Sequence, residues 1–227
     1  MERRGVWTPG FLLAHAALVP GLVAVLLSGS APVALSYAIA ARLAYAGLVT
    51  VALISQDRSG WFTRRWGAEG GFRRFRALAL LLMNHDGAAF VLACWAGRGT
   101  LEIPLPGWAA LAAGAVLAAT GIGVKTWAAR TLPDGAYTWR SFFVPPGESR
   151  WVVTGPYRWI RNPMYTVGYL QCWGLALGLR SVPGLWASGV AHAAILLVNH
   201  LAERPHSARL KARAHESSSR EANPTVR

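Results

Sequence analysis

The sequence predicts an all-α protein, a polytopic membrane helical bundle with about six transmembrane helices. Its 227 residues are 53% hydrophobic and only 15% charged, whereas a soluble domain carries about 25% charged residues. Six apolar runs each come near the roughly 20 residues that a helix needs to cross the hydrocarbon core of a bilayer. These runs cover residues 10–29, 33–54, 77–97, 107–129, 164–182 and 184–202. Because backbone groups in lipid must find their hydrogen bonds within the protein, we expect each run to be a helix.

The basic residues predict how the bundle is oriented. Most of the 23 Lys and Arg residues lie before the first run, between runs two and three, between runs four and five, or after run six. The loops on the other side hold only Arg98 and Arg180. By the positive-inside rule, both termini should therefore be cytoplasmic. The net charge of +13 then reflects topology and anionic lipid headgroups. Since the charge is divided among membrane-flanking segments, we expect no nucleic-acid partner.

The same pattern divides the chain into three parts. Residues 1–76 form an N-terminal two-span membrane hairpin with a basic cytoplasmic loop, and residues 77–205 form a membrane core. Residues 206–227 are polar, and we expect a loosely ordered tail there. The two cysteines, Cys94 and Cys172, lie inside predicted spans, so we expect neither a disulfide framework nor a metal site. The sequence leaves the oligomeric state open.

Charged residues inside the predicted spans are costly and mark functional or structural sites. Arg42 lies near the middle of the second run, and His85 and Asp86 lie near the middle of the third. Consecutive spans run antiparallel, so Arg42 and Asp86 should lie at similar depth, and we expect them to pair. The pair either orients two helices or lines a polar substrate pocket. Lys125 lies near the end of the fourth run, where its ammonium group can snorkel to the interface.

The sixth run carries a polar face. His192, Asn199 and Glu203 are spaced by seven and four residues, which places them on one side of a helix. His200 lies beside that face. A carboxylate at a helix C-terminus is slightly unfavourable with the helix dipole. Glu203 is therefore either a solvated helix end or a functional group.

A polar segment, "GPYRWIRNPMY", covers Gly155–Tyr165 directly before an apolar run. Its glycine and first proline are typical of a turn, and Pro163 is suited to open a helix from its first turn. The free N–H groups of that helix would lie beside Arg161 and Asn162, where they would favour a carboxylate or phosphate. The alternative is an interfacial anchor that holds lipid headgroups with arginine and aromatic side chains.

The segment "GPYRWIRNPMYTVGYL" resembles the signature of the isoprenylcysteine carboxyl methyltransferase and phospholipid N-methyltransferase superfamily, a group of integral-membrane methyltransferases. The matching residues are Gly155, Pro156, Tyr157, Arg161, Pro163, Tyr165 and Gly168, and Asn162 stands where histidine is usual. Glu203 matches the first member of an acidic pair that follows the next helix, whereas Arg204 replaces the second. Gly121 and Gly123 match a G-x-G element in the preceding helix. The resemblance covers about residues 107–205 and makes the membrane core methyltransferase-like.

The resemblance implies that S-adenosylmethionine binds at the cytoplasmic ends of the last three helices. The expected cofactor-binding residues are Gly121, Gly123, Gly155, Pro156, Tyr157, Arg161, Asn162, Pro163, Tyr165, Gly168 and Glu203. Arg161 suits the carboxylate of the cofactor, and Glu203 suits its amino group or ribose hydroxyls. The expected catalytic residues are Asn162, His200 and Glu203.

The methyl acceptor implied by the resemblance is lipophilic and enters sideways from the bilayer. It is a prenylcysteine-type carboxylate, a phospholipid amine, or a related isoprenoid or lipid. Arg42, His85, Asp86 and Asn199 are the residues expected along its path. The carboxyl methyltransferases that the motif resembles place an arginine on the last helix for the substrate carboxylate, where this chain has Asn199 and His200.

Two other functions stay open from the sequence. The replaced second acidic residue and a tail without the tyrosines usual in the family favour a catalytically inactive scaffold or transport-related protein of the same fold. A sterol-type NADPH reductase shares a similar arginine–tyrosine element. Cofactor binding separates these alternatives, since an inactive scaffold should bind none.

Overall fold

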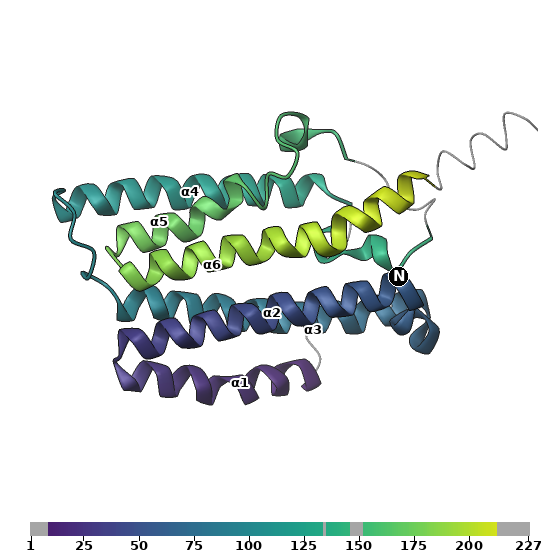
Figure 1. Ribbon diagram of the computed structural model, residues 1–227, viewed down its shortest axis with the longest axis horizontal. Coiled ribbons are helices and arrows are strands. Elements are labelled where there is room, and N and C mark those ends of the chain that lie inside the picture. The colour runs from purple at the N-terminus through teal and green to yellow at the C-terminus, as the bar shows by residue number, and fades with distance from the viewer. Residues whose placement is uncertain (1–8, 134, 146–151, 213–227) are drawn as a thin grey trace, which may run out of the picture.

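A computed structural model of the chain describes residues 9–133, 135–145 and 152–212. These residues form an elongated bundle of α-helices lying side by side, and they contain no β-strand (Figure 1). The helices are α1 (Pro9–Ser28), α2 (Ala31–Ser59), α3 (Trp61–Ala96), α4 (Gly107–Thr131), α5 (Leu170–Gly178) and α6 (Val182–Val198). A π-helical turn, Asn199–Glu203, continues α6, and residues 204–212 are again helical. The predicted all-α membrane bundle is confirmed.

The number of full spans is smaller than predicted. Within the described ranges, five helices are long and apolar enough to cross a membrane, and α5 is not among them. Its nine residues reach only about 13 Å at 1.5 Å per residue, against about 30 Å of hydrocarbon. The run 164–182 is apolar enough to suggest a span. Its first third forms turns and a 3₁₀ turn in place of an α-helix, and hydropathy does not reveal this.

The start of α5 also corrects the role predicted for Pro163. Residues 161–166 form turns, and a 3₁₀ turn, Val167–Tyr169, comes before α5. The backbone N–H of Gly168 donates to the Pro163 carbonyl at 2.8 Å, and the N–H of Thr166 donates to the Asn162 carbonyl at 3.1 Å. The N–H of Tyr165, which a helix beginning at Pro163 would leave free, also donates to the Asn162 carbonyl, at 3.2 Å.

The predicted basic loop between the second and third spans is helical almost throughout. α2 ends at Ser59 and α3 begins at Trp61, with Gly60 between them at φ 62°. The buried side chain of Gln56 caps the new helix, because its Oε1 accepts hydrogen bonds from the N–H groups of Phe62 (3.0 Å) and Thr63 (3.2 Å). Hydropathy located the apolar part of these helices but not their polar ends.

The tight contact between α4 and α5 depends on glycine. A Cβ atom at Gly114 would lie 2.5 Å from the Gly174 carbonyl oxygen, and one at Gly121 would lie 2.3 Å from the Gln171 nitrogen. Small residues let membrane helices approach this closely. The contact holds the N-terminal end of α5 against the second half of α4.

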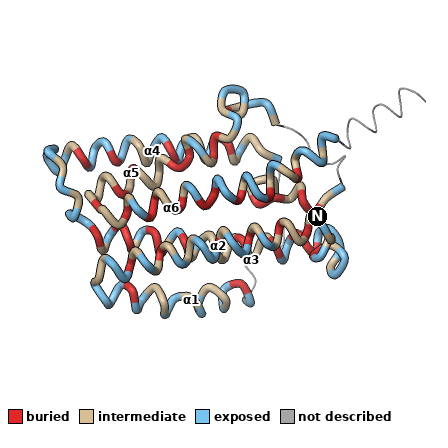
Figure 2. The backbone as a smooth tube through the Cα atoms, in the orientation of Figure 1, coloured by how far each residue is buried: buried red, intermediate tan, exposed pale blue. Residues whose placement is uncertain are grey.

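We call the end of the bundle that holds Ser59, Trp61, Thr131 and residues 204–212 the basic end; it lies at the right of Figure 1. An aromatic cluster fills its interior, with side chains from α2, α3, the segment 136–143, the 3₁₀ turn Val167–Tyr169 and α6. Its aromatic members include Tyr45, Phe62, Phe72, Phe75, Trp139, Phe142, Phe143 and Tyr169. By contrast, α1 is mostly exposed or half-buried (Figure 2).

The segment predicted as a loose tail is ordered in its first part. Residues 206–212 are helical, and the remainder, 213–227, lies outside the described residues. His206 is buried, stacks on Phe142 with ring centroids 3.8 Å apart, and contacts Asp57 through Nδ1 at 2.8 Å. Arg209 also pairs with Asp57. These contacts attach the end of the last helix to α2. The predicted boundary between 1–76 and 77–205 falls inside α3, so both parts share one core.

Candidate functional site

Glu203 is held at the basic end by three hydrogen bonds. Its Oε1 accepts from the indole N–H of Trp139 and the hydroxyl of Tyr165, both at 2.6 Å. Its Oε2 accepts from the amide of Asn199 at 2.8 Å. Of the two interpretations left open by the sequence, these contacts favour the functional one, since a solvated helix end needs no such partners. The carboxylate is fixed in position before any ligand arrives.

The local fold that presents Glu203 is a π-helical turn that ends close to Pro205. Proline has no backbone N–H, so it cannot make the helical hydrogen bond to the residue four positions earlier. In the residue before it, the N–H of Arg204 bonds to the Asn199 carbonyl, five positions back, which closes a π-helical turn. Single π turns of this kind are frequent at functional sites. Here the turn brings the Asn199 amide onto the Glu203 carboxylate.

The segment Gly155–Tyr165 lies between α4 and α5 in the chain and begins with a 3₁₀ turn, Gly155–Arg158. Gly155 has φ 58°, and a Cβ atom there would lie 2.6 Å from Oγ1 of Thr131 at the end of α4. Both conditions require glycine. Further along, Tyr165 bonds to Glu203 through its hydroxyl, and its carbonyl lies 2.8 Å from Nε2 of His192. His192 and Glu203 therefore contact the same residue, as expected for one helical face.

Tyr157 adds a buried hydroxyl near this carboxylate. Its oxygen has no hydrogen-bond partner among the described residues. Burial, with a smaller contribution from the Glu203 charge, raises the pKa of Tyr157 to about 12. The phenol is therefore neutral at physiological pH, with a hydrogen-bond donor unused. A buried polar atom without a partner is unusual and needs an explanation; a bound ligand would supply one.

Other residues predicted for the site lie apart from Glu203. Arg161 and His200 are exposed, and Gly123 faces open space, whereas Gly121 packs on α5. His85 lies 2.9 Å from the Tyr37 hydroxyl through Nε2 and does not line the pocket described below.

The helix N-terminus predicted beside Arg161 and Asn162 is absent, because α5 begins only at Leu170. The prediction of an anion site at that helix end is therefore wrong. Asn162 contributes its backbone carbonyl to the turn, which accepts from the N–H groups of Tyr165 and Thr166.

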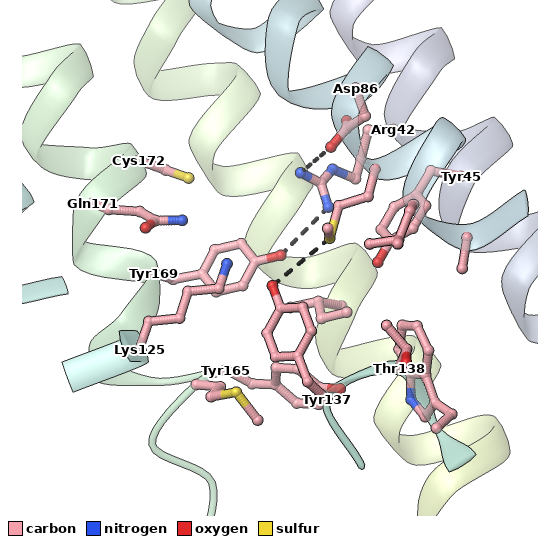
Figure 3. Close-up of a pocket in the computed structure, with 16 residues that line it drawn as sticks. Arg42, Tyr45, Asp86, Lys125, Tyr137, Thr138, Tyr165, Tyr169, Gln171 and Cys172 are labelled. Carbon is pink, nitrogen blue, oxygen red and sulfur yellow. Dashed lines mark hydrogen bonds and ion pairs between the residues drawn. The ribbon is translucent and has the colours of Figure 1, made fainter. Parts of the chain in front are cut away.

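A pocket of about 80 Å³ extends from this region into the bundle (Figure 3). Arg42 and Asp86 lie in it, with Nη2 of the arginine 2.5 Å from Oδ2 of the aspartate. The predicted pair is thus confirmed, and its side chains are only 11% and 4% exposed. Arg42 also donates from Nη1 to the Tyr169 hydroxyl at 3.4 Å.

Lys125 lines the same pocket, which corrects its predicted role. We expected its side chain to snorkel to the interface. Instead it extends beside Tyr169, with Nζ 5.9 Å from the ring centroid (Figure 3). Depth along a helix can be read from the sequence, but the direction in which α4 turns this residue depends on how α4 packs on α5.

The sequence did not reveal the aromatic part of the site. Tyr137, Trp139 and Tyr169 line the pocket, and Trp139 also holds Glu203. A signal existed in "AYTW", an aromatic-rich stretch between two spans, but such residues are also typical of the membrane interface. Trp139 adopts φ 59°, a strained backbone for a bulky residue. Its hydrogen bond to Glu203 and its buried ring hold it there.

Fold and site together define a polytopic helical membrane protein with a charged pocket, two of whose lining residues, Trp139 and Tyr165, hold the Glu203 carboxylate. Residues 109–211 match the sequence family described as phospholipid methyltransferase. This match, with the curated relatives below, confirms the resemblance seen in the motif.

The curated relatives are named phosphatidylethanolamine N-methyltransferase. The chain is 33% identical over 135 residues to the phosphatidylethanolamine N-methyltransferase of Talaromyces marneffei, covering 60% of this chain and 13% of the relative. It is 29% identical over 182 residues to that of Phaeosphaeria nodorum, covering 76% of this chain and 19% of the relative. It is 29% identical over 132 residues to the phosphatidylethanolamine N-methyltransferase of Saccharomyces cerevisiae, covering 58% of this chain and 15% of the relative. The chain thus spans less than a fifth of the length of these relatives. No solved structure matches it.

Proposed function

We propose that the protein is an S-adenosylmethionine-dependent methyltransferase of the membrane that methylates the amine of a phospholipid. The observation that carries this proposal is the hydrogen bond from Tyr165 of the motif, which lines the pocket, to the Glu203 carboxylate. The family match over residues 109–211 supports the reaction class. The names of the relatives favour a phospholipid amine over a prenylcysteine carboxylate, as does the lack of an arginine on α6.

The residues around Glu203 fit the cofactor chemically. When bound, S-adenosylmethionine supplies a methyl group activated by a positively charged sulfur. Carboxylates and aromatic faces stabilise such a cation, and Glu203, Tyr157 and Tyr165 provide both. The unpartnered hydroxyl of Tyr157 is a further donor for the amino-acid part or the ribose. Arg161, exposed at the same end, is the residue we assign to the cofactor carboxylate.

The remaining predicted residues keep roles that follow from their positions. The glycines and prolines of the motif shape the turn, and Gly121 allows the α4–α5 contact. Asn162 and His200 stay predictions as catalytic groups. The protein's own contribution to rate is to hold donor and acceptor in line and to exclude water from them.

A groove on α4 offers the acceptor a route from the bilayer. It has a volume of about 370 Å³ and is lined by Ile122, Lys125, Thr126, Ala129, Arg130, Tyr137 and Gln171. Lys125, Tyr137 and Gln171 also line the inner pocket. A lipid could thus place its headgroup in the pocket while its chains stay beside α4.

Binding of S-adenosylhomocysteine to the detergent-purified protein, measured by calorimetry, tests the cofactor assignment. We expect micromolar binding by the wild type and at least about tenfold weaker binding by Glu203→Gln, since hydrogen bonds to a charged group contribute about 1.5–3 kcal/mol. Glu102→Gln, an exposed acid at the opposite end, is the matched control and should bind as the wild type does.

Other outcomes of this titration separate the alternatives. No binding by a folded wild type would contradict the proposal and favour an inactive scaffold. Binding of NADPH in its place would favour a reductase. Equal affinity in wild type and Glu203→Gln would remove Glu203 from the site.

We also propose that the basic end faces the cytoplasm, as the distribution of arginines predicts. Ala68→Cys at the basic end and Glu102→Cys at the other end both place a thiol at an exposed position. In intact cells a membrane-impermeant maleimide should label Glu102→Cys, whereas Ala68→Cys should react only after lysis. The wild type, with its cysteines in the bundle, sets the background. The reverse labelling pattern would invert the topology.

A further inference from the structure

We propose that Arg42 and Lys125 bind an anionic oxygen group, a phosphate or a carboxylate, of the molecule that occupies the inner pocket. The two sources of such a group are the phosphodiester of a lipid acceptor and the carboxylate of the methyl donor. The inference rests on the proposed function only for naming these sources. It assigns a specific task to residues that lie deeper in the bundle than Glu203.

The first argument is the balance of charge in the pocket. Two cationic side chains, Arg42 and Lys125, line it, and Asp86 is the one carboxylate among the lining residues that the structure describes. Asp86 is already paired with Arg42. No ion pair is seen for Lys125 within the described residues, and the side chain is half-buried. An uncompensated charge in such a place is costly, and a bound anion would relieve that cost.

The second argument is the excess of hydrogen-bond donors. The Nε atom of Arg42 is buried and has no partner among the described residues. The Tyr137 hydroxyl donates only to the sulfur of Met83, at 3.7 Å, which is a weak acceptor. Gln171 adds an amide to the lining. Donors without good acceptors, in a site that also carries net positive charge, are what an oxyanion needs.

The third argument is how the site is assembled. Arg42 comes from α2 and Asp86 from α3, both outside the residues that match the family. Lys125 comes from α4, inside them. The pocket is therefore completed by the N-terminal helices, which gives the hairpin a role beyond anchoring the chain.

The position of Lys125 favours the lipid phosphate of the two sources. It lies six residues before the end of α4, which corresponds to about 9 Å along the helix. It lines both the inner pocket and the groove on α4. Arg130 lines the outer part of that groove. A headgroup phosphate that enters from the bilayer would thus meet Arg130 first and Lys125 next.

The test compares ligands with and without the anionic group, using Lys125→Gln in the full-length protein. The lipid probes are a short-chain phosphatidylethanolamine and the diacylglycerol of equal chain length. The nucleoside probes are S-adenosylhomocysteine and 5′-methylthioadenosine, which lacks the amino-acid carboxylate. Dissociation constants are measured in a non-ionic detergent.

We expect Lys125→Gln to weaken phosphatidylethanolamine binding at least about tenfold, the range for a charged hydrogen bond, and to leave diacylglycerol binding unchanged. Lys125→Arg should restore most of the affinity. Arg98→Gln, an exposed charge at the opposite end, should behave as the wild type. Equal thermal unfolding midpoints would show that Lys125→Gln is folded.

The outcomes separate the two sources. A loss confined to phosphatidylethanolamine assigns the site to the lipid phosphate. A loss confined to S-adenosylhomocysteine, with 5′-methylthioadenosine unaffected, assigns it to the carboxylate of the donor. The inference is overturned if Lys125→Gln weakens the binding of neither anionic ligand. It is also overturned if the ligands without the anionic group lose as much affinity as the anionic ones. A wild type that binds no S-adenosylhomocysteine would contradict the proposed function, whereas the lipid comparison would still test Lys125.

Discussion

Replacing Arg42 by methionine is expected to destabilise the bundle by about 3–5 kcal/mol, the usual effect of leaving one member of a buried ion pair alone. The pair is nearly enclosed, with Asp86 only 4% exposed. Arg42→Met would leave that carboxylate without its cation inside the membrane. The double variant Arg42→Met with Asp86→Leu removes both charges and should be much less destabilised, because buried pairs can often be replaced by apolar residues of similar volume.

A double-mutant cycle measures this coupling. Thermal unfolding of the purified proteins, followed by the loss of monodisperse material, gives the four midpoints. Arg98→Met serves as a control for removing an arginine from an exposed position. Additive losses in the two single variants would contradict a stabilising contact between Arg42 and Asp86. The same double variant should also lose the anion binding proposed above, since it lacks the Arg42 guanidinium.

Gly121→Ala is expected to have the second large effect, a destabilisation of about 1–3 kcal/mol from overpacking. The new methyl group would lie 2.3 Å from the backbone nitrogen of Gln171, and backbone atoms cannot move aside as a flexible side chain does. Helices α4 and α5 would therefore have to separate. Because α4 carries Lys125 and α5 follows directly on Tyr169, their separation should also weaken ligand binding.

Gly123→Ala is the matched control, two residues away on the same helix. A Cβ atom there meets nothing within 4 Å, and alanine is the better helix former. We expect unchanged or slightly higher stability and unchanged S-adenosylhomocysteine affinity. If Gly123→Ala abolished cofactor binding while Gly121→Ala did not, the two glycines would have to be assigned the reverse roles.

The position of residues along the length of the helices was the property that the sequence predicted best. Hydropathy located the long helices, and the antiparallel order of two of them placed Arg42 opposite Asp86. Of the motif residues, Tyr165 contacts Glu203, and the helical spacing of His192 and Glu203 indicated two residues that both contact Tyr165. In each case the prediction needed only distance along a helix or spacing within a short segment.

The direction in which side chains point around a helix, and the length of α5, were predicted less well. The start of α5 at Leu170 depends on which turn takes each N–H group, and an apolar run gives no sign of this. The inward direction of Lys125 depends on the glycine contact between α4 and α5. Trp139 reaches Glu203 from a segment 64 residues away in sequence, and nothing in its local pattern indicates that contact. These features follow from tertiary packing.

The π-helical turn at Asn199–Glu203 has a consequence for how the chain tolerates change. Such a turn acts as one extra residue in a helix, and each residue rotates the following segment by about 100°. Deleting one residue from the turn would return α6 to regular winding and swing everything after it around the axis. His206 and Arg209 would then leave Asp57. The position of the Glu203 carboxylate and the docking of the last helical segment on α2 are thus set by one insertion, so natural variants should keep or lose both together.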